Sequence, residues 1–336
     1  MSDPKPLSEK LLKLKQESSG IADNAILQSI NIDLMRSFEN LEQTNETIKS
    51  FLHVANMNLE GLSIGYDPRW ETVKQSLFEC EVFFKIFPYL KIEKIVEAKG
   101  KTSEKRPDFK VKFSGKEIFI ECKSFSWESP SLTIKKDQED SVEMNIQLAK
   151  AAKKPGVHSA HRSVSPYDNS KKGSKYFLKP ITVIQEKLEN NLKADQLNKG
   201  NTILFLDLSL LTLPEPPHES INPFSISKNG MGTYAWNSTL WTLCCGKEGM
   251  PMFGFAENCP TNENFGYLRY DGIFHKFSNV DAVVFKSHWD HFLHNLVGIE
   301  RETMNHEFID YSVFFEMLNI KVNSSERNRT THWLNV

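Results

Sequence analysis

The chain has 336 residues, with 41 Lys and Arg against 43 Asp and Glu, which gives a formal net charge of -2 at neutral pH. This length allows one large domain or two of modest size. The near balance of charge excludes a globally basic protein, so any contact with nucleic acid has to come from local patches.

Cysteine usage and hydropathy bear on the compartment of the protein. The five cysteines contain no CxxC pair and no even disulfide framework, which favours a reducing cytoplasm. The N-terminus has no apolar run of the signal-peptide kind, and no stretch of about 18 apolar residues predicts a membrane span. We therefore expect a cytoplasmic protein with no membrane partner.

Residues 1–60 are predicted to form a polar helical extension. Apolar side chains such as Leu11, Ile30, Leu34 and Phe38 recur at helical spacing among charged residues. The pattern leaves open whether this extension is an arm, a dimerisation element or a packing layer. A homodimer is therefore one of the alternatives.

A helix is predicted over residues 71–89, with an apolar stripe in its second half. Glu79 falls near the middle of this stripe, whereas Glu81 falls on the opposite, polar side near Lys85. A carboxylate in a buried face is costly unless it is paired or bound to a metal. The pattern nominates Glu79 as a site residue and Glu81 as the second choice; the alternative is that Glu79 lies at the helix edge and reaches solvent. The stripe consists of Val82, Phe83, Ile86, Phe87 and Leu90.

Residues 106–124 are predicted to form a β-hairpin. Apolar and charged residues alternate on both sides of Ser114-Gly115, a small pair suited to a tight two-residue turn. In this register Lys112 faces Glu117.

The same register places Asp108 opposite Glu121, with Lys123 on the same face. Two carboxylates opposite each other repel by about 0.2–1 kcal/mol when they are exposed. A divalent cation removes this conflict, because hard cations take carboxylate oxygens as ligands. A surface hairpin with solvated charges is the alternative.

Pro107-Asp108, a spacer and Glu121-Cys122-Lys123 together resemble the PD-(D/E)xK signature of the restriction-endonuclease-like nuclease superfamily. The resemblance implies that Asp108, Glu121 and the backbone carbonyl of Cys122 hold Mg²⁺ or Mn²⁺. It also implies that Lys123 orients or deprotonates the attacking water. The helix before the hairpin often supplies an acidic residue to this site in the superfamily, which again points to Glu79.

The predicted order of elements over about residues 69–210 is helix, strand, two-stranded hairpin, helix, strand. This order is similar to the αβββαβ core of the same superfamily, so we expect an α/β fold with a mixed central sheet flanked by helices. Residues 61–300 would form this domain, including a basic insertion at 150–179, and residues 301–336 would form a C-terminal helix and tail.

The segment 150–179 carries eight Lys and Arg residues and a single Asp, and its Gly, Ser and Pro content is typical of a loop. Clustered cations neutralise backbone phosphates without reading bases. A solvated loop with incidental charge is the alternative. The predicted nucleic-acid contacts are Lys150, Lys153, Lys154, Arg162, Lys171, Lys172 and Lys175.

These features predict a metal-dependent phosphodiesterase acting on nucleic acid, with a DNA endonuclease favoured over an enzyme acting on RNA. Defence, processing of mobile elements and repair are all compatible with this chemistry. The alternative is a catalytically silent module of the same fold that binds nucleic acid or a protein partner. Loss of Asp108, Glu121 or Lys123 would mark that alternative, and all three are present.

Overall fold

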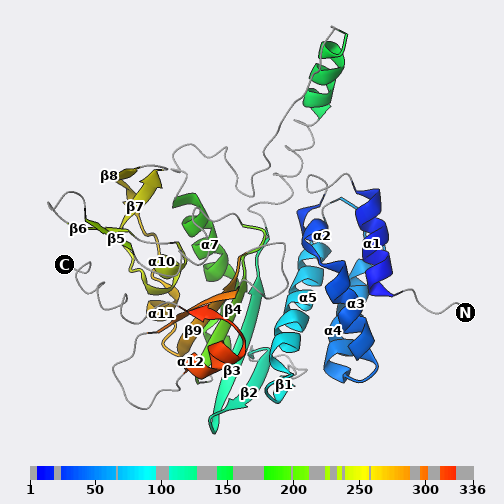
Figure 1. Ribbon diagram of the computed structural model, residues 1–336, viewed down its shortest axis with the longest axis horizontal. Coiled ribbons are helices and arrows are strands. Elements are labelled where there is room, and N and C mark those ends of the chain that lie inside the picture. The colour runs from blue at the N-terminus through cyan, green and yellow to red at the C-terminus, as the bar shows by residue number, and fades with distance from the viewer. Residues whose placement is uncertain are drawn as a thin grey trace, which may run out of the picture. The chain divides into compact units, whose positions relative to one another are not determined.

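A computed structural model describes thirteen ranges of the chain (Figure 1). These are residues 6–18, 24–65, 67–95, 106–126, 142–153, 178–197, 200–211, 224–227, 233–236, 239–256, 259–287, 296–301 and 311–322. The chain divides into two compact units, Met1–Leu77 with Ser126–Lys172 and Phe78–Phe125 with Gly173–Val336. The first boundary falls inside helix α5 (Arg69–Ile86), so this helix contributes to both units.

The first unit is helical throughout its described residues. It contains α1 (Leu7–Glu17), α2 (Ala25–Ser29), α3 (Ile32–Glu42), α4 (Glu46–Leu59) and the start of α5, and residues 142–151 are also helical. The side chains of Asn24, Asn31 and Asn45 accept backbone N–H groups at the starts of α2, α3 and α4. These caps explain why short polar segments begin as helices here, since they satisfy donors that have no partner within the helix.

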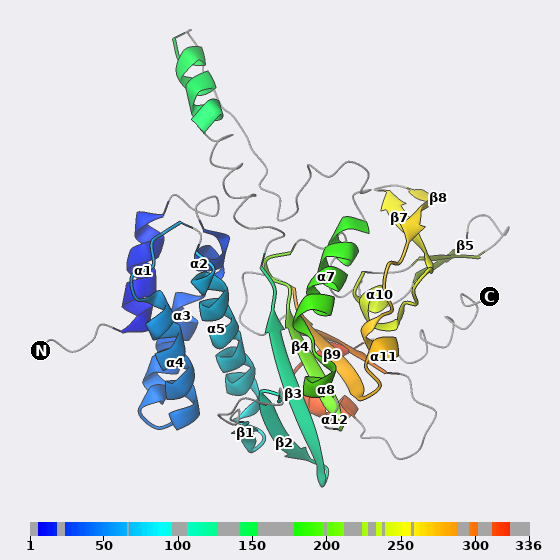
Figure 2. The ribbon, with the colours of Figure 1, turned by 180° about the vertical axis from the view of Figure 1, so that it is seen from behind.

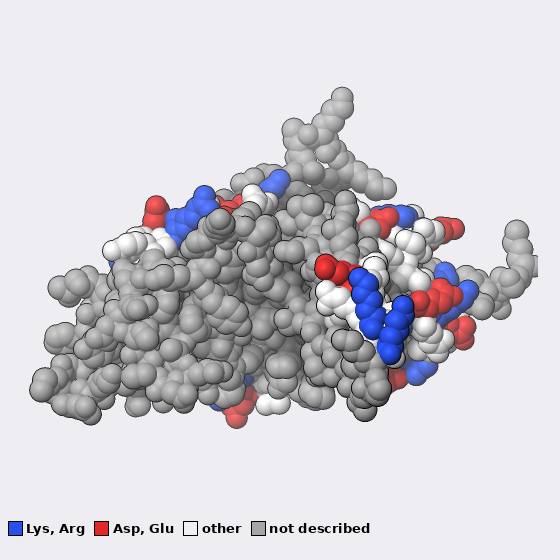
Figure 3. Space-filling view, turned by 90° about the horizontal axis from the view of Figure 1, so that it is seen from above, with Lys and Arg blue, Asp and Glu red and all other residues white. Residues whose placement is uncertain are grey.

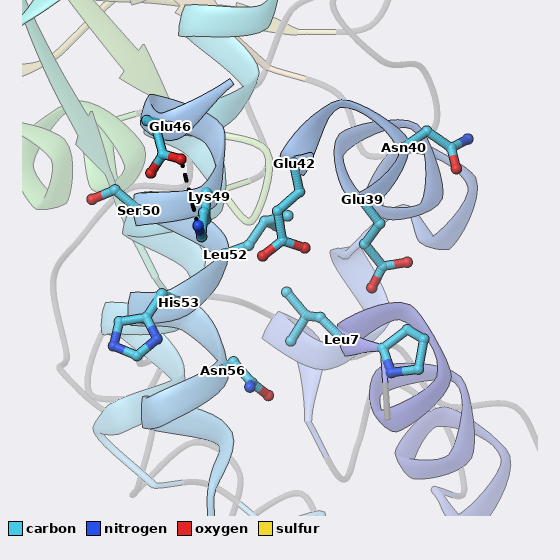
Figure 4. Close-up of a pocket in the computed structure, with 11 residues that line it drawn as sticks. Leu7, Glu39, Asn40, Glu42, Glu46, Lys49, Ser50, Leu52, His53 and Asn56 are labelled. Carbon is cyan, nitrogen blue, oxygen red and sulfur yellow. Dashed lines mark hydrogen bonds and ion pairs between the residues drawn. The ribbon is translucent and has the colours of Figure 1, made fainter. Parts of the chain in front are cut away.

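A groove of about 840 Å³ lies among α1, α3 and α4 (Figure 4). Its wall carries the acidic side chains of Glu39, Glu42 and Glu46, together with Lys49 and His53. Lys49 forms an exposed ion pair of 3.4 Å with Glu46, one turn earlier on α4. The groove is thus mixed in character, because Pro6, Leu7 and Leu52 also line it.

The second unit is built on a mixed seven-stranded sheet in the order β1-β2-β3-β4-β9-β10-β11. β1, β2 and β3 are antiparallel, β3, β4 and β9 are parallel, β10 is antiparallel to β9, and β11 is parallel to β10. The strands are β1 (Ile92–Lys94), β2 (Phe109–Phe113), β3 (Lys116–Ser124), β4 (Thr202–Asp207), β9 (Val280–Lys286), β10 (Leu296–Glu300) and β11 (Lys321–Val322).

The predicted register of the β2–β3 hairpin is confirmed. Phe113 pairs with Lys116, and Lys112 pairs with Glu117. Ser114 and Gly115 have φ values of 48° and 78°, so both turn residues are left-handed, as a type I′ turn requires.

Helices cover both faces of the sheet (Figures 1 and 2). On one face, Phe83 of α5 lies 6.1 Å from Phe109, and Phe314 of α12 (Tyr311–Met317) lies 5.5 Å from Phe113, measured between ring centroids. On the other face, α7 (Leu178–Asn191) leads into α8 (Ala194–Leu197), whose Gln196 reaches Glu121 of β3. Strand β4 is buried at every residue, as its continuous apolar sequence predicts. The expected α/β fold with a mixed sheet flanked by helices is confirmed.

The remaining described elements lie outside the main sheet. Two separate hairpins are formed by β5 (Phe224–Ser227) with β6 (Thr233–Trp236) and by β7 (Pro251–Ala256) with β8 (Cys259–Tyr267). Two short helices complete the unit, α10 (Thr239–Cys245) and α11 (Ile273–Lys276). Within the described ranges, no helix combines the length and apolarity that crossing a bilayer requires.

Candidate active site

Asp108 is held at the start of strand β2 by hydrogen bonds on two sides. Its Oδ2 atom accepts the backbone N–H of Cys122 in β3 at 2.7 Å. Its backbone carbonyl accepts the N–H of Ile95, directly after β1, at 2.9 Å. Asp108 precedes the Phe109–Ile120 pair in the hairpin ladder. The tight turn and the three-stranded antiparallel ladder therefore fix this carboxylate beside the centre of β3.

Glu121 lies in the middle of β3 and is fully buried, with 0% of its surface exposed. Its Oε1 atom receives two donors, Nζ of Lys123 at 2.6 Å and Nε2 of Gln196 at 2.9 Å. Its Oε2 atom has no hydrogen-bond partner among the described residues. Leaving a buried carboxylate oxygen unsatisfied is costly, and such an oxygen is well suited to coordinate a hard cation.

The environment of the two carboxylates disfavours their ionised forms. Burial raises the pKa of Asp108 well above its usual range, and the charges of Glu121 and Glu79 raise it further. Burial likewise raises the pKa of Glu121, although the neighbouring Lys123 opposes this effect. Desolvation and like-charge repulsion both disfavour the ionised forms, and a divalent cation would relieve both.

Lys123 is mostly buried and remains a cation in this environment. Burial lowers its pKa, but the attraction of Glu121 and Asp108 outweighs that effect, so that the net shift is upward. Glu121 and Lys123 are two residues apart on one strand, and the 2.6 Å contact confirms that they share a face. Lys123 therefore partly neutralises Glu121 and presents a positive charge beside the acid pair.

Glu79 is half-buried on α5 and lies close enough to act on the acid pair. Its charge raises the pKa of both Asp108 and Glu121. In the described parts of the chain, however, no three His, Cys, Asp or Glu side chains come together closely enough to hold a metal ion. Asp108 and Glu121 thus form a pair, with Glu79 as a nearby charge.

The predicted position of Glu81 on the polar side of the helix is wrong. Glu81 is buried and its Oε2 atom pairs with Nζ of Lys286 in β9 at 2.5 Å. The cause is that α5 is buried around most of its circumference, including positions such as Cys80 and Val82 on different sides. An apolar stripe does not identify the solvent face of such a helix.

Two residues near the site, and a third that pairs with Glu81, were not predicted from the sequence. Lys94 lies at the end of β1, where burial lowers its pKa and the charges of Glu79 and Asp108 raise it. Gln196 contacts Glu121 directly, and Lys286 pairs with Glu81. The alternation of the strand around Lys94 could have indicated which of its residues share a face, whereas no local pattern marks Gln196 or Lys286.

The Glu81–Lys286 pair is expected to be important for stability. Both side chains are nearly buried, with 10% and 14% exposed, and the ammonium group also lies over the Phe78 ring. Lys286→Met would leave the Glu81 carboxylate buried without its cation. We expect this change to lower the free energy of unfolding by roughly 3–5 kcal/mol, whereas the double variant with Glu81→Leu should recover most of the loss.

Thermal unfolding of the full chain, monitored by calorimetry, measures this effect. Arg269→Met is the control, because it breaks a 2.6 Å pair with Glu186 whose side chains are 60% and 38% exposed. The control should shift the transition little, since exposed pairs contribute at most about 1 kcal/mol. Equal shifts in the two single variants would show that the buried pair has no special role.

The structure describes only part of the predicted nucleic-acid-binding segment. Lys150 and Lys153 are exposed. On the molecular face in Figure 3, acidic and basic side chains of the described residues lie next to each other and form no large patch of one sign. The other predicted contacts, Lys154, Arg162, Lys171, Lys172 and Lys175, lie outside the described residues.

Comparison of the chain with protein-family models, with curated proteins and with solved structures finds no match. The function therefore has to be inferred from the chemistry of the site. That chemistry is a pair of buried carboxylates beside a lysine that remains charged, and one carboxylate oxygen has no partner in the part of the chain that the structure describes.

Proposed function

We propose that this protein is a metal-dependent phosphodiesterase that cuts nucleic acid, with DNA as the favoured substrate. The observation that carries the proposal is the Oε2 atom of the buried Glu121, which has no partner among the described residues and lies next to Asp108 and Lys123. A fold selected for stability alone has no reason to keep such an oxygen beside a second carboxylate.

The topology of the second unit supports the same proposal. Helix α5 is followed by the antiparallel strands β1, β2 and β3, then by α7, and then by β4 parallel to β3. This is the αβββαβ order of the restriction-endonuclease-like core that the PD-(D/E)xK resemblance implies. We propose that the chain has this core, with Asp108, Glu121 and Lys123 in its signature positions.

The residues present fit a divalent cation such as Mg²⁺ or Mn²⁺. Asp108 and Glu121 supply hard oxygen donors, and their pKa values are raised first by burial and then by neighbouring carboxylates. The backbone carbonyl of Cys122 is the third proposed donor, and Glu79 would hold a water molecule at the edge of the site. When bound, the cation would polarise the scissile phosphate and acidify water.

The protein's own groups would then perform distinct tasks during hydrolysis. Water adds to phosphorus and releases a proton to solvent, the bond from phosphorus to the leaving oxygen breaks, and that oxygen takes up a proton from solvent. Lys123, held by Glu121 at 2.6 Å, would orient the attacking water and offset the negative charge that develops on the phosphate. Lys94, on the neighbouring strand β1, would contribute a second positive charge on the side of Asp108 and Glu79.

A cleavage assay tests the proposal directly. Purified full-length protein is incubated with plasmid, single-stranded DNA and RNA in the presence of Mg²⁺, Mn²⁺ or EDTA. We expect cleavage with either metal, no cleavage in EDTA, and loss of cleavage in Asp108→Ala and Lys123→Ala. Cleavage that persists in EDTA, or that survives both substitutions, would refute the mechanism.

A second candidate is a silent module that binds nucleic acid or a protein partner without cutting. It is favoured by one observation, that the described residues contain no preformed group of three metal-ligating side chains. A labelled duplex that binds equally well in Mg²⁺ and in EDTA, and stays intact in both, would establish this alternative.

A further inference from the structure

Gln196 is a neutral side chain that is hydrogen-bonded to the acid pair. It lies on α8, with 6% of its surface exposed, and its Nε2 atom donates to Oε1 of Glu121 at 2.9 Å. The same oxygen also accepts Nζ of Lys123. Both donors therefore act on Oε1, whereas Oε2 accepts no hydrogen bond from any described residue.

This division of the two oxygens has a physical consequence. The terminal torsion of a glutamate is broad and roughly two-fold, so strand β3 fixes where the carboxylate lies but not which oxygen points where. Two donors converging on Oε1 define the rotation of the group and leave Oε2 for a ligand. Lys123 alone would define the rotation less well, because its ammonium group sits on a flexible four-carbon stem.

The neutrality of Gln196 matters as much as its position. A second lysine in its place would neutralise the charge that attracts a cation, whereas an apolar residue would leave Oε1 with one donor. An amide donates a hydrogen bond and keeps the full negative charge on Glu121. Gln196 is therefore suited to hold Glu121, the proposed metal ligand, without reducing the attraction of its carboxylate for a cation.

The local structure keeps Gln196 in place. The chain leaves α7 at Asn191, and the N–H of Gln196 donates to the carbonyl of Lys193 at 3.0 Å, which starts the short helix α8. The flanking Leu192 and Leu197 are buried and anchor both ends of this segment. Gly200 then turns the chain into β4 with a φ of 126°, a value that residues other than glycine rarely adopt.

We infer that Gln196 is a positioning residue, which orients the Glu121 carboxylate so that Oε2 faces the metal ion of the proposed nuclease. This inference rests on the proposed function and extends it to a residue that lies 75 positions from Glu121 in the sequence. Partners of this kind, which contact a metal ligand rather than the metal, typically change metal affinity by about 10–100-fold when they are removed.

The test is the isosteric change Gln196→Met, compared with wild type and with Gln185→Met. Gln185 is a matched control, because it has 3% of its surface exposed and donates Nε2 to the carbonyl of Tyr270 at 2.8 Å, in the same unit. Binding of Ca²⁺, measured by calorimetry without substrate, should be about tenfold weaker in Gln196→Met. The Mg²⁺ concentration that gives half-maximal cleavage should rise by a similar factor, whereas the rate at saturating Mg²⁺ should change by only about twofold.

Gln185→Met should leave both metal constants unchanged, even if its melting temperature falls as much as that of Gln196→Met. Wild-type metal constants in a folded Gln196→Met protein would overturn the inference, and so would an equal loss in Gln185→Met, which would indicate a general structural effect. A wild-type protein that neither binds Ca²⁺ nor cuts nucleic acid would instead overturn the proposed function itself, and this inference with it.

Discussion

Asp108→Asn is expected to abolish cleavage and at the same time to stabilise the metal-free protein. The amide keeps an oxygen that can accept the N–H of Cys122, but it removes the negative charge beside Glu121 and Glu79. We expect cleavage in Mg²⁺ to be about 10³-fold slower, since several kcal/mol of metal-dependent stabilisation are lost. In EDTA at neutral pH, the variant should be more stable than wild type by roughly 1 kcal/mol.

The stability advantage of Asp108→Asn over wild type should increase as the pH rises. Because the folded pKa of Asp108 lies above its unfolded value, the folded wild-type chain retains a proton that the unfolded chain has lost. Wild-type stability therefore falls as pH rises from about 4 through the raised pKa. The advantage of Asp108→Asn should be small near pH 4 and complete once the pH exceeds the folded pKa.

Thermal unfolding in EDTA at a series of pH values measures this difference. Asp33→Asn is the control, because Asp33 lies on the surface of α3 in an exposed pair with Arg36. Added Mg²⁺ should raise the melting temperature of wild type and of the control, but not that of Asp108→Asn. If Asp108→Asn is less stable than wild type throughout the pH range, the two carboxylates do not repel each other as proposed.

Lys123→Met is expected to separate metal binding from cleavage. The substitution removes the cation that lies 2.6 Å from Oε1 of Glu121 and leaves Gln196 as the remaining donor to that oxygen. The net charge of the site becomes more negative, so the affinity of the protein for Ca²⁺ should be kept or increased. Cleavage at saturating Mg²⁺ should fall by about 10²–10⁴-fold, the range typical of a lost acid–base or charge-stabilising group.

Calorimetric titration with Ca²⁺ and single-turnover cleavage at saturating Mg²⁺ provide the two measurements. Lys110→Met is the matched control on the same hairpin, because Lys110 is likewise ion-paired with glutamate, with Glu93 at 3.6 Å and Glu117 at 3.4 Å. This control should change neither quantity. A Lys123→Met protein that cuts at the wild-type rate would exclude Lys123 from the reaction, and one that no longer binds Ca²⁺ would assign it a structural role.

The hairpin shows why part of the site could be predicted. Its register depends on the two-residue turn at Ser114-Gly115 and on the alternation around it, and all of its paired residues lie close together in the sequence. A one-residue shift would move every side chain to the other face, so the apolar residues specify the register strongly. The placement of Asp108, Glu121 and Lys123 near one another follows from these local properties.

Helix α5 shows the limit of the same reasoning. The spacing of apolar residues correctly predicts a helix, but it predicts the wrong environment for Glu81, which is buried against Lys286. A buried acid on a helix of mixed polar and apolar residues looks like a surface residue until its partner is known, and this partner is 205 positions away in the sequence.

By itself, the sequence specified the hairpin, its acid pair and lysine, and the α/β order of elements, because each of these depends on residues that are neighbours along the chain. Which residues contact the buried carboxylates of Glu121 and Glu81 could be learned only from the tertiary structure. The contacts of Gln196 with Glu121 and of Lys286 with Glu81 form only when distant segments pack against the sheet. Such contacts leave no periodic trace in the sequence, since one side chain at one position suffices to make each of them.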